Sequence, residues 1–207
     1  MCIRDRLYTM HDPKYNYLYE TEPEPFMNNR KMFCPRGKML GGSSSHNGMV
    51  HVRGNPMDFE NWAQKDLKSW NYNNVLPYFK KSESIEGLDE TYRNKSGPLK
   101  LSRSSEGNEL SKVYLEAAEQ AGYEINNDMN GYKQEGFGLM DTTIYGGRRQ
   151  STSVTYLHPV INRRNLTVIT NTIVNKVIIE NNKAVGVECT TGSCLLYTSP
   201  SPRDDSQ

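Results

Sequence analysis

The chain has 207 residues, a formal net charge of +1 at pH 7 and 35% hydrophobic residues, which is enough apolar material for one domain-sized core. The near-neutral charge gives no electrostatic argument for nucleic-acid binding, and no apolar run is long enough to span a membrane. No secretory signal peptide is visible. These features leave a globular domain with a packed core.

The two ends of the chain read as one DNA sequence and its reverse complement. Residues 1–6 and the run Cys-Leu-Leu-Tyr-Thr at 194–198 can be encoded by complementary strands, as expected for a sequencing-library adapter read through at both ends. We therefore expect residues 1–6 and 194–207 to be adapter artefacts, with a natural Ser/Pro-rich tail as the alternative. Two of the four cysteines then remain, Cys34 and Cys189, which form neither a disulfide framework nor a metal site and fit a reducing compartment.

The segment 7–31 is polar and aromatic and contains Pro13, Pro23 and Pro25. Proline disfavours helix interiors, so this pattern predicts an extended surface segment.

A glycine- and serine-rich stretch follows at 35–54 and predicts tight turns where the backbone passes close to a bulky group. Serines at 43–45 and apolar residues within 49–52 predict a short helix behind the turns. A glycine turn before a helix N-terminus suits an anion such as a pyrophosphate. On these residues alone, a plain tight turn is an equal alternative. The glycines of the turns are Gly37, Gly41 and Gly42.

Two helices are expected next. Asn55 and Pro56 begin the first, which turns Phe59 and Trp62 towards the core. After a polar turn, the second is expected over 75–81.

The polar run 83–94 predicts a flexible loop, and the alternation at 97–102 predicts a strand. Asn108 then caps an amphipathic helix that Gly122 ends. We expect its apolar face to pack against the rest of the domain. That face consists of Leu110, Val113, Ala117, Ala118 and Ala121.

The last part of the segment predicts strands around one helix. A strand is expected within 139–145, a helix over 152–157 and a half-buried strand over 165–170. A hairpin is expected from 172–180 to 184–189.

Two adjacent cations precede the helix predicted over 152–157 and leave two interpretations open. Arg148 and Arg149 could grip a carboxylate or phosphate, or they could be exposed or structurally paired, which we favour.

One long motif carries a resemblance to a known family. It runs Pro-Arg-Gly-Lys-Met-Leu-Gly-Gly-Ser-Ser from Pro35, continues as Asn-Gly-Met-Val from Asn47 and Arg-Gly from Arg53, and extends to Asp58 and Trp62. This string resembles the first sequence signature of the glucose–methanol–choline (GMC) oxidoreductases, which are FAD enzymes that oxidise alcohols. Within the family, the chain is most similar to the choline dehydrogenase branch. Supporting stretches lie at 19–30, 130–138 and 147–152.

The resemblance implies an α/β (mixed α+β) fold with a partial FAD-binding, Rossmann-like domain and part of a substrate-binding domain. Residues 7–93 would belong to the FAD-binding domain with the first signature and a lid or loop region. Residues 94–160 would belong to the substrate-binding domain, and 161–193 would form a β-hairpin that returns to the FAD-binding domain. The first nucleotide-binding unit and the catalytic histidine are expected outside this segment. No residue here is therefore assigned as catalytic, and the segment alone is expected to be inactive.

The resemblance also implies an activity, namely oxidation of choline to betaine aldehyde by hydride transfer to the flavin. The expected partners are a small alcohol and a membrane electron acceptor, with membrane association only through that acceptor and no nucleic acid. The expected location is the bacterial cytoplasm or inner-membrane periphery, or the mitochondrion of a eukaryote. The alternatives are another GMC alcohol oxidase or dehydrogenase, or a non-catalytic relic.

Contacts with FAD are implied for eight residues, and no metal site is expected. His46 stands where the choline oxidase branch carries FAD covalently, so a covalent link and a histidine packed beside non-covalent FAD are both open. His11, His51 and His158 are expected to be surface or structural residues. The eight residues are Met39, Gly42, His46, Asn47, Gly48, Met49, Val50 and, through its backbone to the adenine, Val174.

Overall fold

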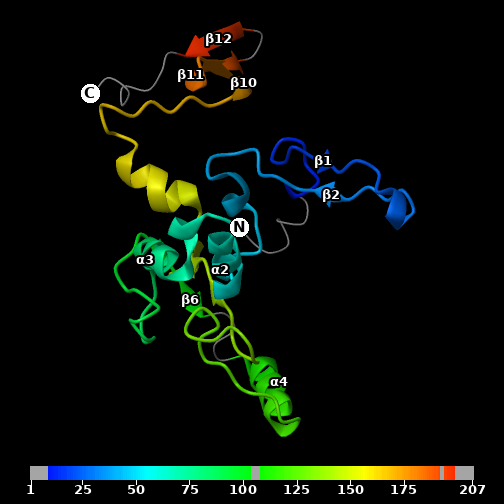
Figure 1. Cartoon of the computed structure of the whole chain (residues 1–207), viewed down its shortest axis with the longest axis vertical. Helices are drawn as coiled ribbons and strands as arrows, with labels where there is room; N and C mark the ends of the chain where they lie inside the picture. Colours follow the sequence, from blue (N-terminus) through cyan, green and yellow to red (C-terminus); the bar gives the residue numbers. More distant parts are fainter. Residues whose placement is uncertain (1–8, 104–107, 192–193, 199–207) are drawn as a thin grey trace. The chain divides into compact units, whose positions relative to one another are not determined.

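The computed structural model describes residues 9–103, 108–191 and 194–198 and divides into two compact units, one up to Pro159 and one from Val160. The first unit mixes short strands with helices, and the second consists mainly of a three-stranded antiparallel sheet (Figure 1). Within the described residues, no helix combines the length and hydropathy needed to cross a bilayer.

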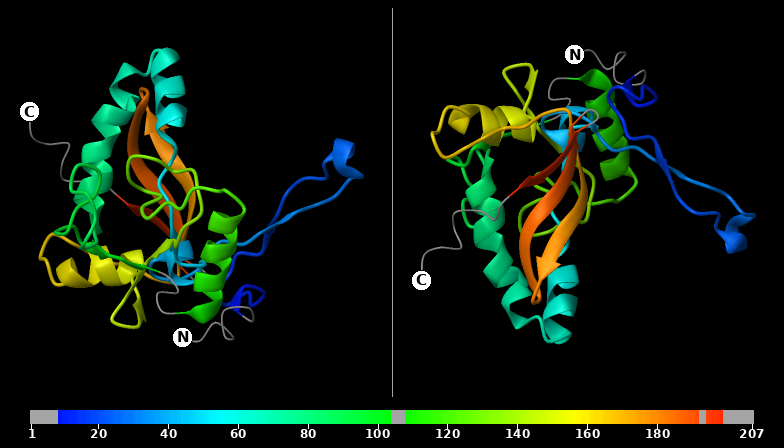
Figure 2. Two further views of the ribbon diagram at one scale, coloured as in Figure 1. Left: turned by 90° about the horizontal axis from the view of Figure 1, so that it is seen from below. Right: turned by 90° about the horizontal axis from the view of Figure 1, so that it is seen from above.

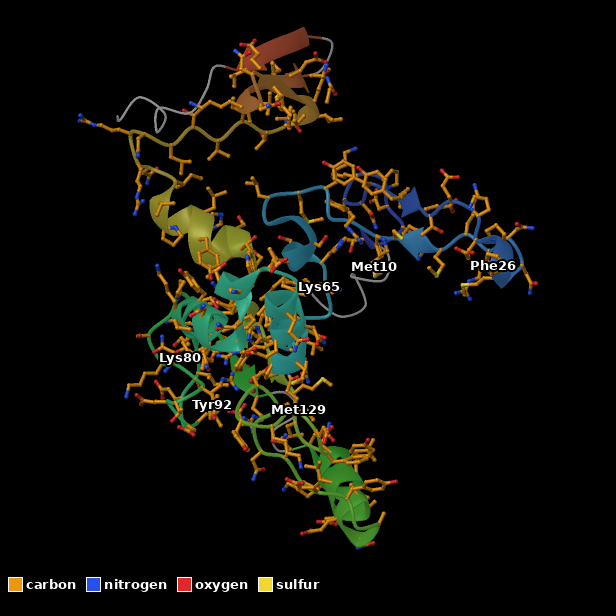
Figure 3. The ribbon with its side chains drawn as sticks, viewed as in Figure 1. Met10, Phe26, Lys65, Lys80, Tyr92 and Met129 are labelled. Atoms are coloured by element: carbon orange, nitrogen blue, oxygen red, sulfur yellow. The ribbon has the colours of Figure 1, made fainter. Side chains whose placement is uncertain are left out.

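The first described segment is extended, as its prolines predict. β1 (Tyr19–Glu20) pairs antiparallel with β2 (Phe33–Cys34), and the 3₁₀ turn η1 (Pro25–Met27) lies between them. Figure 3 shows Phe26 at the far end of this arm, where its side chain is 97% exposed.

A small antiparallel sheet joins three parts of the first unit that are far apart in sequence. β3 (Val50–His51) pairs with β7 (Asp141–Thr142), and β7 also pairs with β6 (Ser102–Arg103). Residues near the end of the glycine- and serine-rich stretch are therefore hydrogen-bonded to a strand about ninety residues later in the chain. Next to β6 in sequence, β5 (Leu99–Lys100) pairs in parallel with β4 (Glu83–Ser84), so the strand predicted over 97–102 is confirmed as two short strands.

The helices α2, α3 and α4 each begin at an asparagine cap. α2 (Pro56–Gln64) follows Asn55, whose side chain accepts a hydrogen bond from the backbone of Met57. α4 (Glu109–Gln120) follows Asn108 in the same way. These two helices are confirmed where the caps predict them.

The second helix begins earlier than the sequence pattern indicates. α3 (Tyr72–Ser82) is capped by Asn71, whose Oδ1 accepts from the amide of Asn74 at 2.9 Å. The preceding residues form the 3₁₀ turn η3 (Lys68–Trp70). Several asparagines in this segment can cap a helix, and the structure uses the first of them.

Aromatic rings pack α2 against α3. The ring of Phe59 lies 5.4 Å from that of Trp62 and 5.7 Å from that of Phe79, both in edge-to-face geometry. Phe59 is buried as expected, but Trp62 is half exposed because it lies at the edge of the cluster against Trp70.

The apolar face of α4 is largely uncovered, contrary to the expectation that it packs. Ala118 is buried, whereas Leu110 is 77% exposed. The first turns of α4 border an open hollow that is also lined by Val50 of β3 and Thr142 of β7.

A hairpin and an irregular helix end the first unit. β8 (Ile144–Tyr145) pairs with β9 (Arg148–Arg149) across two glycines that both have positive φ. The helix predicted over 152–157 is present as a π-helical segment, η4 (Ser153–Leu157), followed by the 3₁₀ turn η5 (His158–Val160).

The second unit contains the predicted hairpin. β10 (Thr172–Glu180) pairs antiparallel with β11 (Lys183–Thr191), and Figure 2 shows the two as a long twisted ribbon in orange. The turn between them places Asn181 and Asn182 at positive φ, which favours the asparagines found there. β12 (Cys194–Thr198), in the range expected to derive from an adapter, pairs with β11.

One predicted strand is absent. Residues 166–170 have no regular secondary structure, and the amide of Leu166 donates to the carbonyl of Arg163 at 3.1 Å, which closes a turn. The alternation of apolar residues there is wrong as a strand signal because no neighbouring strand pairs with this described stretch.

Candidate functional site

The glycine-rich stretch forms a tight loop rather than a loop followed by a helix. Gly41 and Gly42 have φ values of +86° and +54°, which side chains resist. A Cβ on Gly37 would lie 2.4 Å from the carbonyl oxygen of Gly42, so the predicted close approach of backbone to backbone is confirmed. We call residues 37–50 the glycine loop.

The helix predicted over 49–52 is wrong. After the single 3₁₀ turn η2 (Gly42–Ser45), the chain turns at Met49 and enters β3. The amide of Thr143 donates to the carbonyl of Met49 at 2.8 Å, and the pairing with β7 begins one residue later. Strand pairing with a distant segment therefore decides the conformation of an apolar run that is too short to fix a helix by itself.

The outer side of the glycine loop is open. Asn47, Gly48 and Val50 are exposed, and a Cβ built on Gly42 would meet no atom within 4 Å. Met49 has a φ of +64°, an uncommon conformation for a residue with a side chain. Backbone strain of this kind concentrates at binding sites, where the surrounding structure holds it in place. An open backbone face with a strained turn suits the close approach of a large ligand such as a dinucleotide.

His46 is turned into the protein. Its side chain is only 4% exposed, and its backbone amide donates to the carbonyl of Ser43 at 3.2 Å. Met39 is half buried, and its carbonyl accepts from the amide of Gly42 at 2.8 Å. These two residues lie at the inner side of the loop, whereas Asn47 and Gly48 lie at its outer side.

The glycine loop is held by the segment 149–152, about a hundred residues later. Arg149 Nη1 donates to the backbone oxygen of Asn47 at 2.9 Å, to Asn47 Oδ1 at 2.8 Å and to the carbonyl of Ser44 at 3.2 Å. The amide of Thr152 donates to Ser44 Oγ at 2.9 Å. We call Arg149 and Thr152 the clamp. The structurally paired interpretation of Arg149 is confirmed, and its partners are the loop itself.

A buried cluster of charged residues lies beyond the loop and overturns one expectation. The run 83–94 is not simply a flexible loop, because Glu83 and Arg93 at its two ends are 0% and 1% exposed. Arg93 Nε donates to Glu83 Oε1 at 2.7 Å, its Nη2 donates to Asp141 Oδ2 at 2.7 Å, and its Nη1 binds Asp128. We call these four residues, together with Arg53, the charge cluster.

Arg53 connects the charge cluster to the glycine loop. Its Nη2 lies 2.8 Å from Glu83 Oε1, and its backbone amide donates to Asn130 Oδ1 at 2.8 Å. His51, two residues earlier in β3, places Nε2 3.4 Å from Glu83 Oε2. Buried charged side chains therefore hold β3 and the residues that follow it.

The cluster sets the ionisation of its central pair. Burial by itself would raise the pKa of Glu83, but hydrogen bonds from His51 and Arg93 and the charges of Arg93 and Arg53 outweigh it and lower the pKa from 4.5 to about 2. For Arg93, burial acts to lower the pKa, and the bonds and charges of Glu83 and Asp141 raise it above its ordinary value. Both groups are therefore charged at neutral pH, as a closely bonded buried pair requires.

Sequence reasoning missed this cluster. Charged residues in a run without apolar periodicity are normally solvated, and nothing local distinguishes Glu83 or Arg93 from their exposed neighbours. The one sequence signal is Arg53, which belongs to the family motif and whose Nη2 lies 2.8 Å from Glu83 Oε1.

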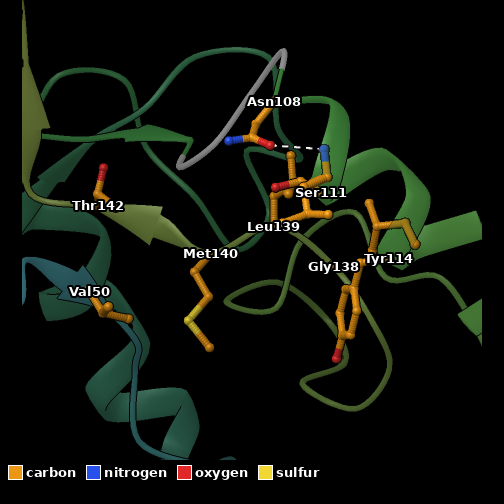
Figure 4. Close-up of a pocket in the computed structure, with 10 residues that line it drawn as sticks. Val50, Asn108, Ser111, Tyr114, Gly138, Leu139, Met140 and Thr142 are labelled. Carbon is orange, nitrogen blue, oxygen red and sulfur yellow. Dashed lines mark hydrogen bonds between the residues drawn. The ribbon is translucent and has the colours of Figure 1, made fainter.

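An apolar hollow of about 500 Å³ lies beside Val50. Figure 4 shows Met140 and Thr142 at the β7 side of this hollow and Tyr114 on α4 at the opposite side. None of its ten lining residues carries a charge, and Tyr114 is the one aromatic residue among them. The hollow can therefore take an apolar group, but it lacks a carboxylate for a cation.

The remaining histidines have structural contacts, as expected. The ring of His11 stacks on Phe33 at 5.2 Å, and His158 Nε2 lies 3.3 Å from Ser153 Oγ.

Cys34 and Cys189 are free, and the part of the chain that the structure describes contains no cluster of three or more acidic, histidine or cysteine ligands. Val174 lies in β10 of the second unit, half exposed, so its contact with a cofactor stays a prediction.

Comparison with curated proteins finds relatives that are named choline dehydrogenases. It is 46% identical over 177 residues to the mitochondrial choline dehydrogenase of Mus musculus and 47% identical over 188 residues to the oxygen-dependent choline dehydrogenase of Escherichia coli O6:H1. The aligned parts cover 86% and 89% of this chain but only 30% and 34% of those proteins. The chain thus spans about a third of the length of the curated relatives it matches.

Solved structures show the same fold. The chain superposes on pyridoxine 4-oxidase from Mesorbium loti with a TM-score of 0.82 at 26% identity, over 89% of this chain and 37% of that one. It superposes on an Aspergillus oryzae formate oxidase variant with a TM-score of 0.76 at 25% identity, over 89% of this chain and 34% of that one. The family description "GMC oxidoreductase" matches residues 9–197. The chain therefore belongs to the GMC oxidoreductase family.

Proposed function

We propose that the chain is part of a longer FAD-dependent enzyme that oxidises the CH–OH group of a small alcohol, with choline as the leading substrate. The observation that supports this best is the open glycine loop, whose sequence carries the family motif and whose outer face has exposed backbone beside Asn47 and Gly48. The relatives named choline dehydrogenase support the substrate. Residues 7–93 and 161–193 would contribute to the FAD-binding domain and 94–160 to the substrate-binding domain.

FAD supplies the chemistry when it is bound, because it accepts the hydride from the alcohol carbon. The segment's own contribution is to hold and orient it. Gly42 gives the backbone room for a close approach, Asn47 offers a side-chain amide, and Gly48 and Val50 present an exposed backbone and an apolar surface. Met39 and Met49 would flank the same site, and Val174 would meet the adenine through its backbone. A proton acceptor for the alcohol is expected from outside residues 9–198.

We propose non-covalent FAD as the leading arrangement and a covalent bond to His46 as the alternative. The side chain of His46 is 4% exposed, so a ring atom must become accessible before it can bond to a flavin. Burial beside the loop fits a histidine that supports the loop from the inside.

The electron acceptor and the location follow the relatives. We propose that electrons pass to a membrane-associated acceptor, and that the protein reaches the membrane only through that acceptor. The relatives include a mitochondrial protein and bacterial ones, so a mitochondrial location and a bacterial cytoplasmic or inner-membrane location are both open.

The test uses the full-length protein that carries this segment. Purified protein is expected to show flavin absorbance, to reduce an artificial electron acceptor with choline, and to release its flavin on acid precipitation. Flavin that stays with the precipitate supports the His46 link, and a His46→Ala variant should then release it. Rapid peroxide formation with oxygen as acceptor favours an oxidase. Protein that neither binds FAD nor oxidises any primary alcohol overturns the proposal.

A further inference from the structure

The amide side chain of Asn47 is held in one orientation. Its Oδ1 accepts a hydrogen bond from Arg149 Nη1 at 2.8 Å and a second from the backbone amide of Met49 at 3.1 Å. Both partners are N–H donors, so the atom between them must be the amide oxygen rather than the nitrogen. The two donors therefore distinguish the oxygen from the nitrogen of an amide that could otherwise be turned over.

Arg149 also fixes the backbone around that amide. The same Nη1 donates to the backbone oxygen of Asn47 at 2.9 Å and to the carbonyl of Ser44 at 3.2 Å. Arg149 lies in β9, in a hairpin with two tight glycines, and is 102 residues away from Asn47 in sequence. The orientation of Asn47 is thus imposed by a separate and structured part of the first unit.

The consequence is a fixed donor on the outer side of the glycine loop. Oxygen and nitrogen of a planar amide lie on opposite sides of its carbon, so an oxygen turned towards Arg149 turns the NH₂ group away from it. Asn47 is exposed, and its neighbours Gly48 and Val50 are exposed on the same stretch. The site therefore presents a hydrogen-bond donor, and an acceptor atom of the ligand suits it.

We infer that Arg149 is a positioning residue that orients Asn47 so that its Nδ2 donates to an acceptor atom of the bound flavin or its ribityl chain. This inference rests on the proposed function, because it assigns the donor to the FAD of that same site. Arg149 contacts the glycine loop through Ser44 and Asn47, and its role is to set which end of the Asn47 amide faces the cofactor.

A structural role for Arg149 alone makes a different prediction. If Arg149 merely stabilises the loop, then a variant of Asn47 that keeps both accepted hydrogen bonds should bind FAD normally. Asn47→Asp is such a variant, since it has nearly the same shape and keeps oxygens for Arg149 and Met49 but loses the Nδ2 donor. Arg148→Ala is the matched control, because Arg148 is the neighbouring arginine of β9 and its guanidinium has no hydrogen bond or ion pair within the described residues.

The experiment measures FAD affinity of the full-length apoprotein by flavin fluorescence, together with the flavin absorbance spectrum and thermal unfolding without FAD. We expect Asn47→Asp and Arg149→Ala each to weaken FAD binding about tenfold, the range of one lost hydrogen bond. The variant that combines Asn47→Asp and Arg149→Ala should bind FAD no more than about twofold less tightly than the weaker-binding single variant, because both substitutions remove the same donor contact. Arg149→Lys keeps one donor and should be intermediate, and Arg148→Ala should match the wild type.

Two failures are distinguishable. Wild-type protein that does not bind FAD overturns the proposed function. Wild-type protein that binds FAD while Asn47→Asp binds it equally well, with an unchanged flavin spectrum, overturns only the role of Asn47 and Arg149. If Arg149→Ala fails to fold, Asn47→Asp still decides the outcome, because its unfolding midpoint is expected to stay at the wild-type value.

Discussion

The charge cluster and the clamp both use an arginine from a distant segment, but they solve different problems. Arg93 is 1% exposed, and its side-chain partners are the carboxylates of Glu83, Asp128 and Asp141. Arg149 is half buried, and its partners on the glycine loop are neutral oxygens of Ser44 and Asn47. Buried opposite charges must remain paired for the fold to persist, whereas neutral partners at an open edge fix a geometry at little electrostatic cost.

The charge cluster and the clamp therefore have different roles in the first unit. The charge cluster joins β4, β7 and Arg53, two residues after β3, and so holds the strands next to the glycine loop. The clamp binds Ser44 and Asn47 of the glycine loop, where we propose that the cofactor binds. Variants of the cluster should therefore change stability, and variants of the clamp should change ligand binding more than stability.

The largest effect is expected for Arg93→Met, which removes the buried cation that Glu83 and Asp141 share, although Arg53 stays beside Glu83. We expect a loss of about 3–5 kcal/mol in the free energy of unfolding, or no folded protein at all. Chemical denaturation of the full-length protein measures it. Lys95→Met is the matched control, because Lys95 pairs with Glu90 at 2.7 Å with both side chains more than half exposed, and it should leave the unfolding midpoint unchanged. Equal stability of the two variants would contradict a structural role of the cluster.

The next effect is a pH dependence carried by Glu83. Its pKa is lowered from 4.5 to about 2 in the folded state, so the unfolded state binds a proton more readily in acid. The stabilisation is complete above about pH 5 and is lost as the pH falls from 4.5 towards 2, with an amplitude of about 3 kcal/mol. Denaturation at pH 7 and at pH 3 measures it. At pH 7, Glu83→Gln should be less stable than the wild type, and its free energy of unfolding should differ less between pH 7 and pH 3. If the variant shows the same difference between the two pH values as the wild type, other groups cause the pH dependence.

The smallest effect on stability is expected at the clamp. Ser44→Ala removes the hydroxyl that accepts from the amide of Thr152 at 2.9 Å and lies 3.1 Å from Thr152 Oγ1. Because the site is at an open edge where water can replace the hydroxyl, we expect a loss of about 1 kcal/mol in stability. FAD affinity should fall several-fold in the same variant. A large loss of stability with unchanged FAD binding would contradict the expectation that the clamp affects ligand binding more than it affects stability.

Local sequence signals predicted the parts of the fold that depend on neighbouring residues. Asn55 and Asn108 each begin the helix they were expected to cap, because a side-chain acceptor meets backbone amides two residues away. The hairpin around Asn181 and Asn182 is also local, because its turn requires positive φ at both positions.

The errors occur where a distant segment decides the structure. The apolar run at 49–52 lies in a strand because β7 pairs with it, and the run at 166–170 is irregular because no described strand does. Leu110 shows the same limit in a helix: the amphipathic pattern is real, but the position of other elements decides whether the face is covered.

The family, the glycine loop and the residues expected to meet a cofactor could be predicted from the sequence alone, because a motif and the φ requirements of glycine can be read along one stretch of chain. The burial of Glu83 and Arg93 and the hydrogen bonds from Arg149 to Asn47 became apparent only in the folded structure. The physical reason is that burial and hydrogen-bond partnership are properties of residue pairs. Asn47 and Arg149 are 102 residues apart, and nothing in either local sequence specifies the other.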